Sequence, residues 1–143
     1  MKALTLIQPW ATLIAMKEKK IETRSWRTLY QGELAIHAGK KIDKKICERE
    51  PYKSVLAAHG YTDDNLPTGC VVAICTLLDC CKIFYDEADG VSRLMDFGCT
   101  KIEGNELAFG DYKAGRYGWK LHDVKMLTEP IPAKGALSLW EWL

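Results

Sequence analysis

The chain has 143 residues, 48% of them hydrophobic and 27% charged, which is the size of one ordinary domain with a buried core and excludes a disordered chain. The net charge of +1 argues against a strongly basic nucleic-acid binder, but residues 1–53 hold 12 Lys and Arg against 6 Asp and Glu. This basic half is compatible with a phosphate-bearing partner, or with plain neutralisation by the acidic half of the chain.

We expect neither a membrane segment nor a signal peptide. No apolar run reaches the roughly 18 residues needed to span a bilayer, and Gln8 and Pro9 interrupt the apolar N-terminus before any cleavage site. The six cysteines form no Cys-x-x-Cys pair. We therefore expect reduced thiols in a cytoplasmic protein, with no bound metal and no other cofactor.

The first part of the chain predicts a strand, a short helix and two more strands. Residues 3–7 alternate as in a half-buried strand. Pro9 suits the first turn of a helix because its missing N–H has no partner there, and apolar residues at helical spacing extend this helix to residue 18. Two strands follow over residues 20–26 and 32–38, joined by a turn.

The middle of the chain predicts two helices followed by a long buried strand. Asp43 is a good N-cap for a helix over residues 44–50, and Pro51 begins a second helical stretch that ends at Gly60. After a polar loop, residues 70–84 are rich in Val, Ile and Leu, which is typical of a strand buried on both faces.

The last part of the chain predicts an irregular segment, one more long strand and a C-terminal clamp. Residues 86–111 are rich in Asp, Glu and Gly and predict a loop with a short helix. Residues 115–127 predict the last long strand. Over residues 130–143, two prolines impose an extended turn, after which four residues are expected to pack back on the core: Leu137, Leu139, Trp140 and Leu143.

The order of these elements lacks the regular alternation of a doubly wound sheet. We therefore expect a single α+β domain over residues 1–143. Its predicted form is a small, mostly antiparallel β-barrel with two or three helices at its ends.

The strand predicted over residues 20–26 carries polar side chains where a core strand would carry apolar ones. Because side chains alternate along a strand, four of them share one face: Lys20, Glu22, Arg24 and Trp26. Burying unpaired charges is costly, so this face lines either solvent or a cleft. If the face is solvent-exposed, it belongs to an edge strand whose charges discourage aggregation. If it lines a cleft, Trp26 can stack on bases, and Arg24 and Arg27 on either side of it can bind phosphates.

Four segments in order resemble ASCH domains, the activating signal cointegrator homology family, which is related to PUA domains. They are "LTLIQPWATLIAMKEKKIETRSW", "GELAIHAGKK", "FGDYKAGRYGWKL" and "PIPAKGALSLW". The family pattern Gly-x-Lys-x-x-Glu-x-Arg is matched by Lys19, Glu22 and Arg24, and Lys17 stands in place of its glycine. The resemblance implies a PUA-like barrel, a cleft between the first helix and the barrel wall, and an RNA- or nucleotide-related role.

Members of the family differ in activity. One small relative hydrolyses the acetyl amide of N4-acetylcytidine with a lysine at the position of Lys19 and a threonine at the position of Glu22. Another is described as a ribonuclease that acts on single strands. This chain keeps the lysine and has Glu22 in place of the threonine.

Lys19 and Glu22 are the candidate catalytic residues. A lysine that is partly desolvated beside Arg24 has its ammonium form disfavoured, which favours a nucleophilic amine. Glu22 has the chemistry of a general base for a water or a ribose hydroxyl. The alternatives are structural: a solvated lysine in a turn, and a Glu22–Arg24 ion pair that fixes the helix against the barrel.

Further binding candidates lie outside the charged strand. Gln8 and Trp10 stand at the start of the first helix, where unpaired N–H groups hold phosphates. Trp10 either stacks a base or belongs to the core. Arg116 pairs a cation with the aromatic ring of Tyr117, and Lys134 on a proline-rich turn is expected to line the same cleft.

We expect a nucleic-acid-binding module whose partner is RNA, a single-stranded segment or a nucleotide-like ligand. Bases would stack on Trp10 or Trp26, and phosphates would be held by a set of cations: Lys19, Lys20, Arg24 and Arg27. One alternative is a hydrolase that acts on RNA or on a modified nucleoside with Lys19 and Glu22. Another is a small-molecule or protein-interaction domain that uses the same cleft. No obligate protein partner is inferred.

Overall fold

The computed structural model describes all 143 residues and contains seven strands and four short helices. In chain order the elements are β1 (Lys2–Gln8), α1 (Trp10–Ala15), β2 (Ile21–Arg24), β3 (Gly32–Ile42), α2 (Lys44–Cys47), α3 (Tyr52–Ala58), β4 (Cys70–Asp86), β5 (Val91–Leu94), α4 (Gly104–Ala108), β6 (Tyr117–Pro132) and β7 (Leu139–Glu141). Five of the six strand pairs are antiparallel, and only β1 and β3 run parallel. The expected α+β fold with a mostly antiparallel sheet is therefore confirmed.

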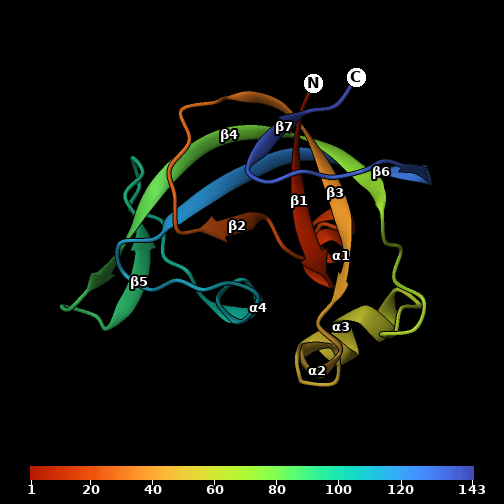
Figure 1. Ribbon diagram of the computed structural model, residues 1–143. Helices are drawn as coiled ribbons and strands as arrows, with labels where there is room; N and C mark the ends of the chain where they lie inside the picture. Colours follow the sequence, from red (N-terminus) through yellow and green to blue (C-terminus); the bar gives the residue numbers. More distant parts are fainter.

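The sheet curves strongly but does not close into the barrel that we expected. Its strand order is β2-β6-β4-β3-β1-β7, and β5 pairs with the last residues of β4. Figure 1 shows the long strands β4 and β6 arching over the space in which α1 and β2 lie. β2 has only four residues and pairs with β6 alone, so no backbone ladder joins it to β1. The other edge strand, β7, pairs with β1 alone, so the two edges of the sheet remain apart.

The main core lies between the curved sheet and α1. Leu4 and Ile36 from the parallel pair and Leu77 and Trp119 from the antiparallel pair pack with Ile14 of α1. Five of the six residues of α1 are buried, and a helix that is apolar all round belongs inside a protein. This buried helix thus fills the concave side of the sheet and leads directly into the turn before β2.

Most predicted elements are present, but several ends differ. α1 ends at Ala15 rather than at residue 18, because Lys17 turns the chain with a left-handed φ of 65°. β3 continues to Ile42, where it still pairs with Gln8 of β1. β5 was not predicted, since its four residues lie in a segment whose composition is typical of a loop.

The two predicted middle helices pack on the outer side of α1. The carboxylate of Asp43 accepts a hydrogen bond from Ile46 N at 3.1 Å, which confirms the N-cap of α2. α3 ends just before Gly60, which has the left-handed φ of 83° expected of a C-terminal glycine. Leu13 of α1 and Leu56 of α3 share a second hydrophobic cluster.

The C-terminal segment packs less completely than expected. β7 pairs with β1, and Trp142 N donates to Met1 O at 2.8 Å, so the two termini lie side by side (Figure 1). Leu137 and Leu143, which we expected to pack back, are 93% and 97% exposed. The reason is that β7 pairs for only three residues and these two leucines lie outside it. None of the four helices combines the length and the apolar character of a membrane-spanning helix.

Candidate functional site

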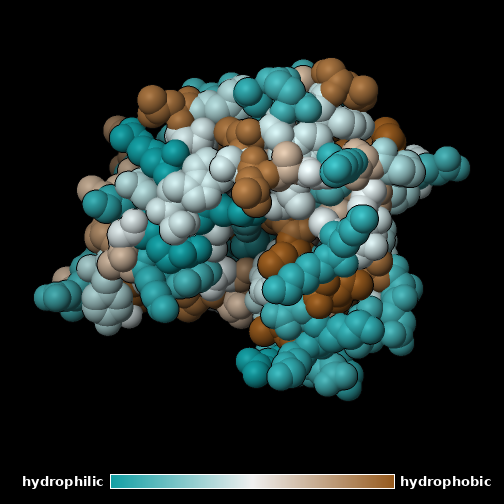
Figure 2. Space-filling view, viewed as in Figure 1, coloured by the Kyte–Doolittle hydropathy of each residue, from teal (hydrophilic) through white to brown (hydrophobic).

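A pocket of about 560 Å³ opens between β1, α1 and β2. Its walls are formed by residues 5–7 and Trp10, by residues 22–26, by residues 109–111, and by Tyr52 and Arg116. Figure 2 shows a hollow near the centre of this face, between the side that carries β2 and α4 and the side that carries the other three helices. The pocket thus lies in the opening that an incomplete sheet leaves between β1 and β2.

The side chain of Arg24 crosses this opening. Its Nη2 donates to the backbone oxygen of Thr5 on β1 at 3.0 Å, and its Nε donates to Oε2 of Glu22 at 2.9 Å. A side-chain hydrogen bond therefore takes the place of a strand ladder between β1 and β2. The ion pair of Glu22 and Arg24, which we considered as an alternative, is present, although it fixes β2 against β1 rather than a helix against a barrel.

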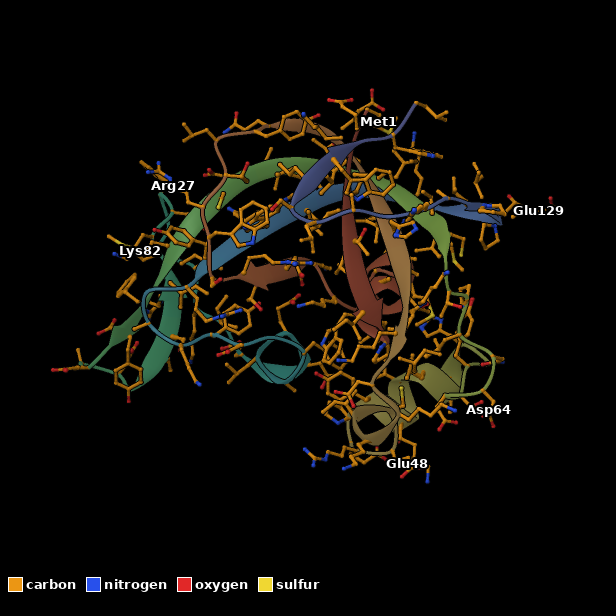
Figure 3. All side chains as sticks on the ribbon, in the orientation of Figure 1. Met1, Arg27, Glu48, Asp64, Lys82 and Glu129 are labelled. Carbon is orange, nitrogen blue, oxygen red and sulfur yellow. The ribbon has the colours of Figure 1, made fainter.

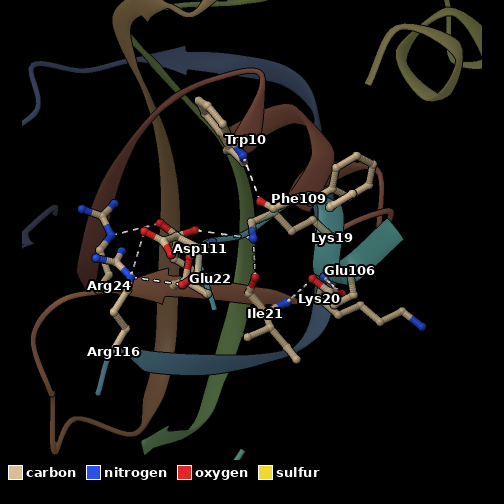
Figure 4. Close-up of polar contacts among 12 residues, drawn as sticks. Trp10, Lys19, Lys20, Ile21, Glu22, Arg24, Glu106, Phe109, Asp111 and Arg116 are labelled. Carbon is tan, nitrogen blue, oxygen red and sulfur yellow. Dashed lines mark hydrogen bonds and ion pairs between the residues drawn. The ribbon is translucent and has the colours of Figure 1, made fainter. Parts of the chain in front are cut away.

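Lys19 lies behind Glu22 and is not part of the pocket wall. Its side chain is fully buried, with Nζ donating to Ile21 O at 2.6 Å and lying 3.8 Å from Oε1 of Glu22. Burial lowers the pKa of Lys19, and the negative charges of Glu22 and Glu106 oppose this effect. The carboxylate of Glu22 thus has a cation on each side, Arg24 at the pocket and Lys19 in the interior (Figure 4).

A second ion pair completes the polar wall. Nε of Arg116 donates to the backbone oxygen of Asp111 at 3.1 Å and lies 3.6 Å from its Oδ2. Figure 4 shows the two arginines beside the carboxylates of Glu22 and Asp111. The lining holds two carboxylates and two guanidinium groups, so the charge of the pocket is balanced.

Two indole rings form the less polar part of the wall. Nε1 of Trp10 donates to Phe109 O at 3.0 Å, and its ring meets Tyr52 edge-on with centroids 6.0 Å apart. Trp26 is half-buried and packs edge-on against Trp119 at a centroid distance of 4.8 Å. Rings held in this way present a rigid, partly exposed surface of the kind on which nucleobases stack.

The structure brings together five of the residues that the sequence singled out. The pocket is lined by Trp10, Glu22, Arg24, Trp26 and Arg116. Alternation along a strand was a sound guide to Glu22 and Arg24, which share one face of β2. Trp10 is neither purely core nor free, because it packs on Tyr52 and also lines the pocket.

Gln8 does not belong to the pocket. It is fully buried, and its amide nitrogen donates to Thr12 Oγ1 at 2.7 Å and to Pro67 O at 2.8 Å. Its amide oxygen accepts from Thr12 N at 3.0 Å. These bonds fix the first turn of α1 and leave the Gln8 side chain no group for a phosphate.

The remaining predicted cations lie in other places. Lys20 precedes β2 and lines a separate hollow together with Lys17. Arg27 is exposed at the outer edge of the molecule (Figure 3). Lys134 lines a further hollow on the other side of Thr5. Of the predicted row, only Lys20 lies away from the pocket, because β2 begins after it at Ile21.

Sequence reasoning missed Asp111 and Thr5. Asp111 lies in a segment that predicted only a loop, and nothing distinguishes it there from the other acidic residues nearby. Thr5 contributes a backbone oxygen to Arg24, and no pattern of side chains reveals such a contact. Only the fold brings these groups to the pocket.

Comparisons with known proteins agree with the first three of the four segments quoted above, which lie within the matched residues. The model of the ASCH domain family matches residues 4–130. Activating signal cointegrator 1 of Homo sapiens is 30% identical over 98 residues, and the Mus musculus protein is 31% identical over 98 residues. Each match covers 65% of this chain and 17% of the relative, so the chain spans less than a fifth of the length of these relatives.

Proposed function

The chain belongs to the ASCH domain family, and from this premise we propose that it binds single-stranded RNA by taking one unstacked base into the pocket between β1 and β2. One observation carries the proposal: two fixed indole rings and two ion pairs, with both signs of charge, face the same pocket of about 560 Å³. Sequence-specific recognition of RNA uses such splayed bases, stacked on aromatic rings and bonded along their edges.

The balanced charge of the wall favours a base over a bare phosphate. A nucleobase is neutral and carries both donors and acceptors along its edge. Arg24 and Arg116 offer N–H donors, and the carboxylates of Glu22 and Asp111 offer acceptors. The volume lies within the range of roughly 300–1,000 Å³ that small-ligand pockets show.

The first test replaces an arginine of the pocket. Arg116→Gln should weaken the binding of a fluorescently labelled, unstructured RNA about tenfold, because it removes charge-assisted donors to the base. The measurement is fluorescence polarisation. Arg27→Gln is the matched control, since Arg27 is exposed outside the pocket, and it should leave the dissociation constant unchanged. Equal affinities for the two variants would overturn the proposal.

A hydrolase is the second candidate, and the position of Glu22 favours it. Glu22 lines the pocket with a carboxylate held by Arg24 at 2.9 Å, which suits a general base acting on a water or a ribose hydroxyl. Lys19 is sealed behind it, so in this candidate Lys19 positions Glu22 and does not attack the substrate. Incubation of wild type and Glu22→Gln with N4-acetylcytidine and with unstructured RNA tests the candidate. Turnover that is absent, or that survives the substitution, would eliminate it.

A further inference from the structure

A second, larger hollow adjoins the pocket between β1 and β2, which we call the base pocket because the proposed function places a base in it. It measures about 980 Å³ and lies between the strands β1 and β3 and the segment of residues 132–137. Figure 1 shows this segment crossing in front of β1 and β3 on its way from β6 to β7. Thr5 lines both hollows, so they adjoin at this residue of β1, and we refer to the two together as the groove.

The two hollows differ in charge. The base pocket is balanced, whereas the second hollow is lined by Lys40 and Lys134 and by no Asp or Glu. A wall with only positive charges attracts phosphate groups. The base pocket has no surplus of cations for the phosphates of a bound strand, and the second hollow supplies that surplus next to it.

The wall that carries Lys134 is held firmly in place. His37 Nε2 bonds to Ala133 O at 2.7 Å, and Trp140 Nε1 donates to Thr5 Oγ1 at 3.0 Å. Gly135 sits so close to β1 and β3 that a Cβ there would lie 2.6 Å from Thr5 Oγ1 and 2.7 Å from the His37 ring. The backbone on both sides of Lys134 is thus fixed, so its exposed side chain starts from this rim of the groove.

A third hollow is the competing path for a strand. It is lined by Lys17 and Lys20, but also by Asp123, and the ammonium of Lys120 within it is already bonded to Asp96 at 3.1 Å. It shares no lining residue with the base pocket. The shared lining residue and the charge therefore both favour the hollow beyond Thr5.

We propose that the hollow beside Lys40 and Lys134 holds the backbone phosphates of the nucleotides adjacent to the base in the pocket, so that the ligand is an oligonucleotide and not a free nucleoside. The inference rests on the proposed function, because it assigns a path to the strand whose base enters the pocket. Leu137, which is 93% exposed on the same wall, offers an apolar contact to the next base along the strand.

The test compares a charged with an uncharged backbone. The probes are a labelled hexamer of uridine and the same hexamer with methylphosphonate in place of its phosphodiesters. The double variant Lys40→Ala/Lys134→Ala should bind the natural hexamer about tenfold more weakly than wild type, because two phosphate contacts are lost. With the methylphosphonate probe it should match wild type within about twofold.

Two controls separate this inference from the proposed function. Lys17→Ala/Lys20→Ala removes the same charge from the third hollow and should retain the wild-type affinity for the natural hexamer. The assignment of phosphates to the hollow beside Lys40 and Lys134 is wrong if both double variants have the same affinity for the natural hexamer. It is also wrong if Lys40→Ala/Lys134→Ala loses the same affinity for both probes. Arg116→Gln should weaken both probes equally, since it acts on the base; if it weakens neither, the base pocket itself is wrong and the path falls with it.

Discussion

At the scale of single residues, the burial of Lys19 differs most from what its neighbours in the sequence predict. It stands beside Lys20 in the sequence, yet Lys19 is fully buried and Lys20 is exposed. Its backbone nitrogen bonds to Leu13 O at 3.1 Å at the end of α1, which turns the side chain inward beneath Glu22. A buried ammonium with one hydrogen bond and one carboxylate at 3.8 Å carries a desolvation cost.

The lowered pKa of Lys19 predicts a stability that rises with pH. Below this lowered pKa the ammonium is charged in both states, and the folded protein bears the full cost of burial. Between the lowered pKa and the ordinary value of 10.5, the unfolded chain binds the proton and the folded protein does not, so the free energy of unfolding increases. The increase amounts to about 1.4 kcal/mol for each unit by which the pKa is lowered.

Urea denaturation of wild type and Lys19→Met at several pH values between 7 and 10.5 measures this effect. The variant lacks the titrating group, so wild type should gain stability relative to it as the pH rises. Burial raises the pKa of Cys75 and Cys81 to about 12, which lowers stability at high pH in both proteins equally. A constant difference between the two proteins across the range would contradict the lowered pKa.

At the scale of elements, the end of α1 explains the one departure from the family pattern. Lys17 N bonds to Ile14 O at 2.9 Å and Glu18 N bonds to Leu13 O at 3.0 Å. These two bonds are those of a Schellman motif, whose C′ residue adopts a left-handed conformation and is usually glycine. α3 ends with the same pair of bonds and has Gly60 at the C′ position. Lys17 thus occupies a glycine position, at a cost in backbone strain.

We predict that Lys17→Gly stabilises the protein by about 1 kcal/mol, because glycine has no Cβ to oppose a φ of 65°. Gly60→Ala is the reciprocal control: a Cβ there meets no atom within 4 Å, so only the left-handed φ opposes it, and it should destabilise by about the same amount. Chemical denaturation measures both. A Lys17→Gly variant that is less stable than wild type would show that the left-handed conformation of Lys17 does not strain the backbone.

Arg24 is the other feature at this scale. β2 pairs with β6 alone, and the guanidinium of Arg24 replaces a second ladder with one bond to β1 and one to Glu22. A full ladder at this place would close the opening between β1 and β2. The pocket therefore exists because one side chain, and not a strand, spans the gap.

At the scale of the whole molecule, the charge distribution limits how the proposed RNA ligand could be held. The net charge is +1, and the ion pairs of the pocket neutralise each other. In the two hollows of the proposed groove, the lysines and arginines without a carboxylate partner are Lys40 and Lys134. Binding of this kind depends on base contacts more than on the general attraction of phosphates.

The corresponding prediction concerns salt. For single strands the logarithm of the binding constant falls with the logarithm of salt concentration by roughly 0.7 for each phosphate contact, so two contacts give a slope of about −1.4. Titrations of a labelled uridine hexamer between about 50 and about 200 mM KCl measure it. A slope steeper than about −4 would mean that many more lysines and arginines contact the strand than the groove contains.

The sequence by itself determined the strands with clear alternation or long β-branched runs, the caps at Asp43 and Gly60, and the placement of Glu22 and Arg24 on one face of a strand, because all of these depend on residues close together in the chain. The tertiary structure alone decided that the sheet stays open, that Lys19 is buried while Lys20 is exposed, and that Arg116 and Asp111 join Glu22 at one pocket. It also decided that Lys134 lies beyond Thr5 in a different hollow. The physical reason is that side-chain spacing encodes local geometry, whereas the pairing of distant strands sets which surfaces meet.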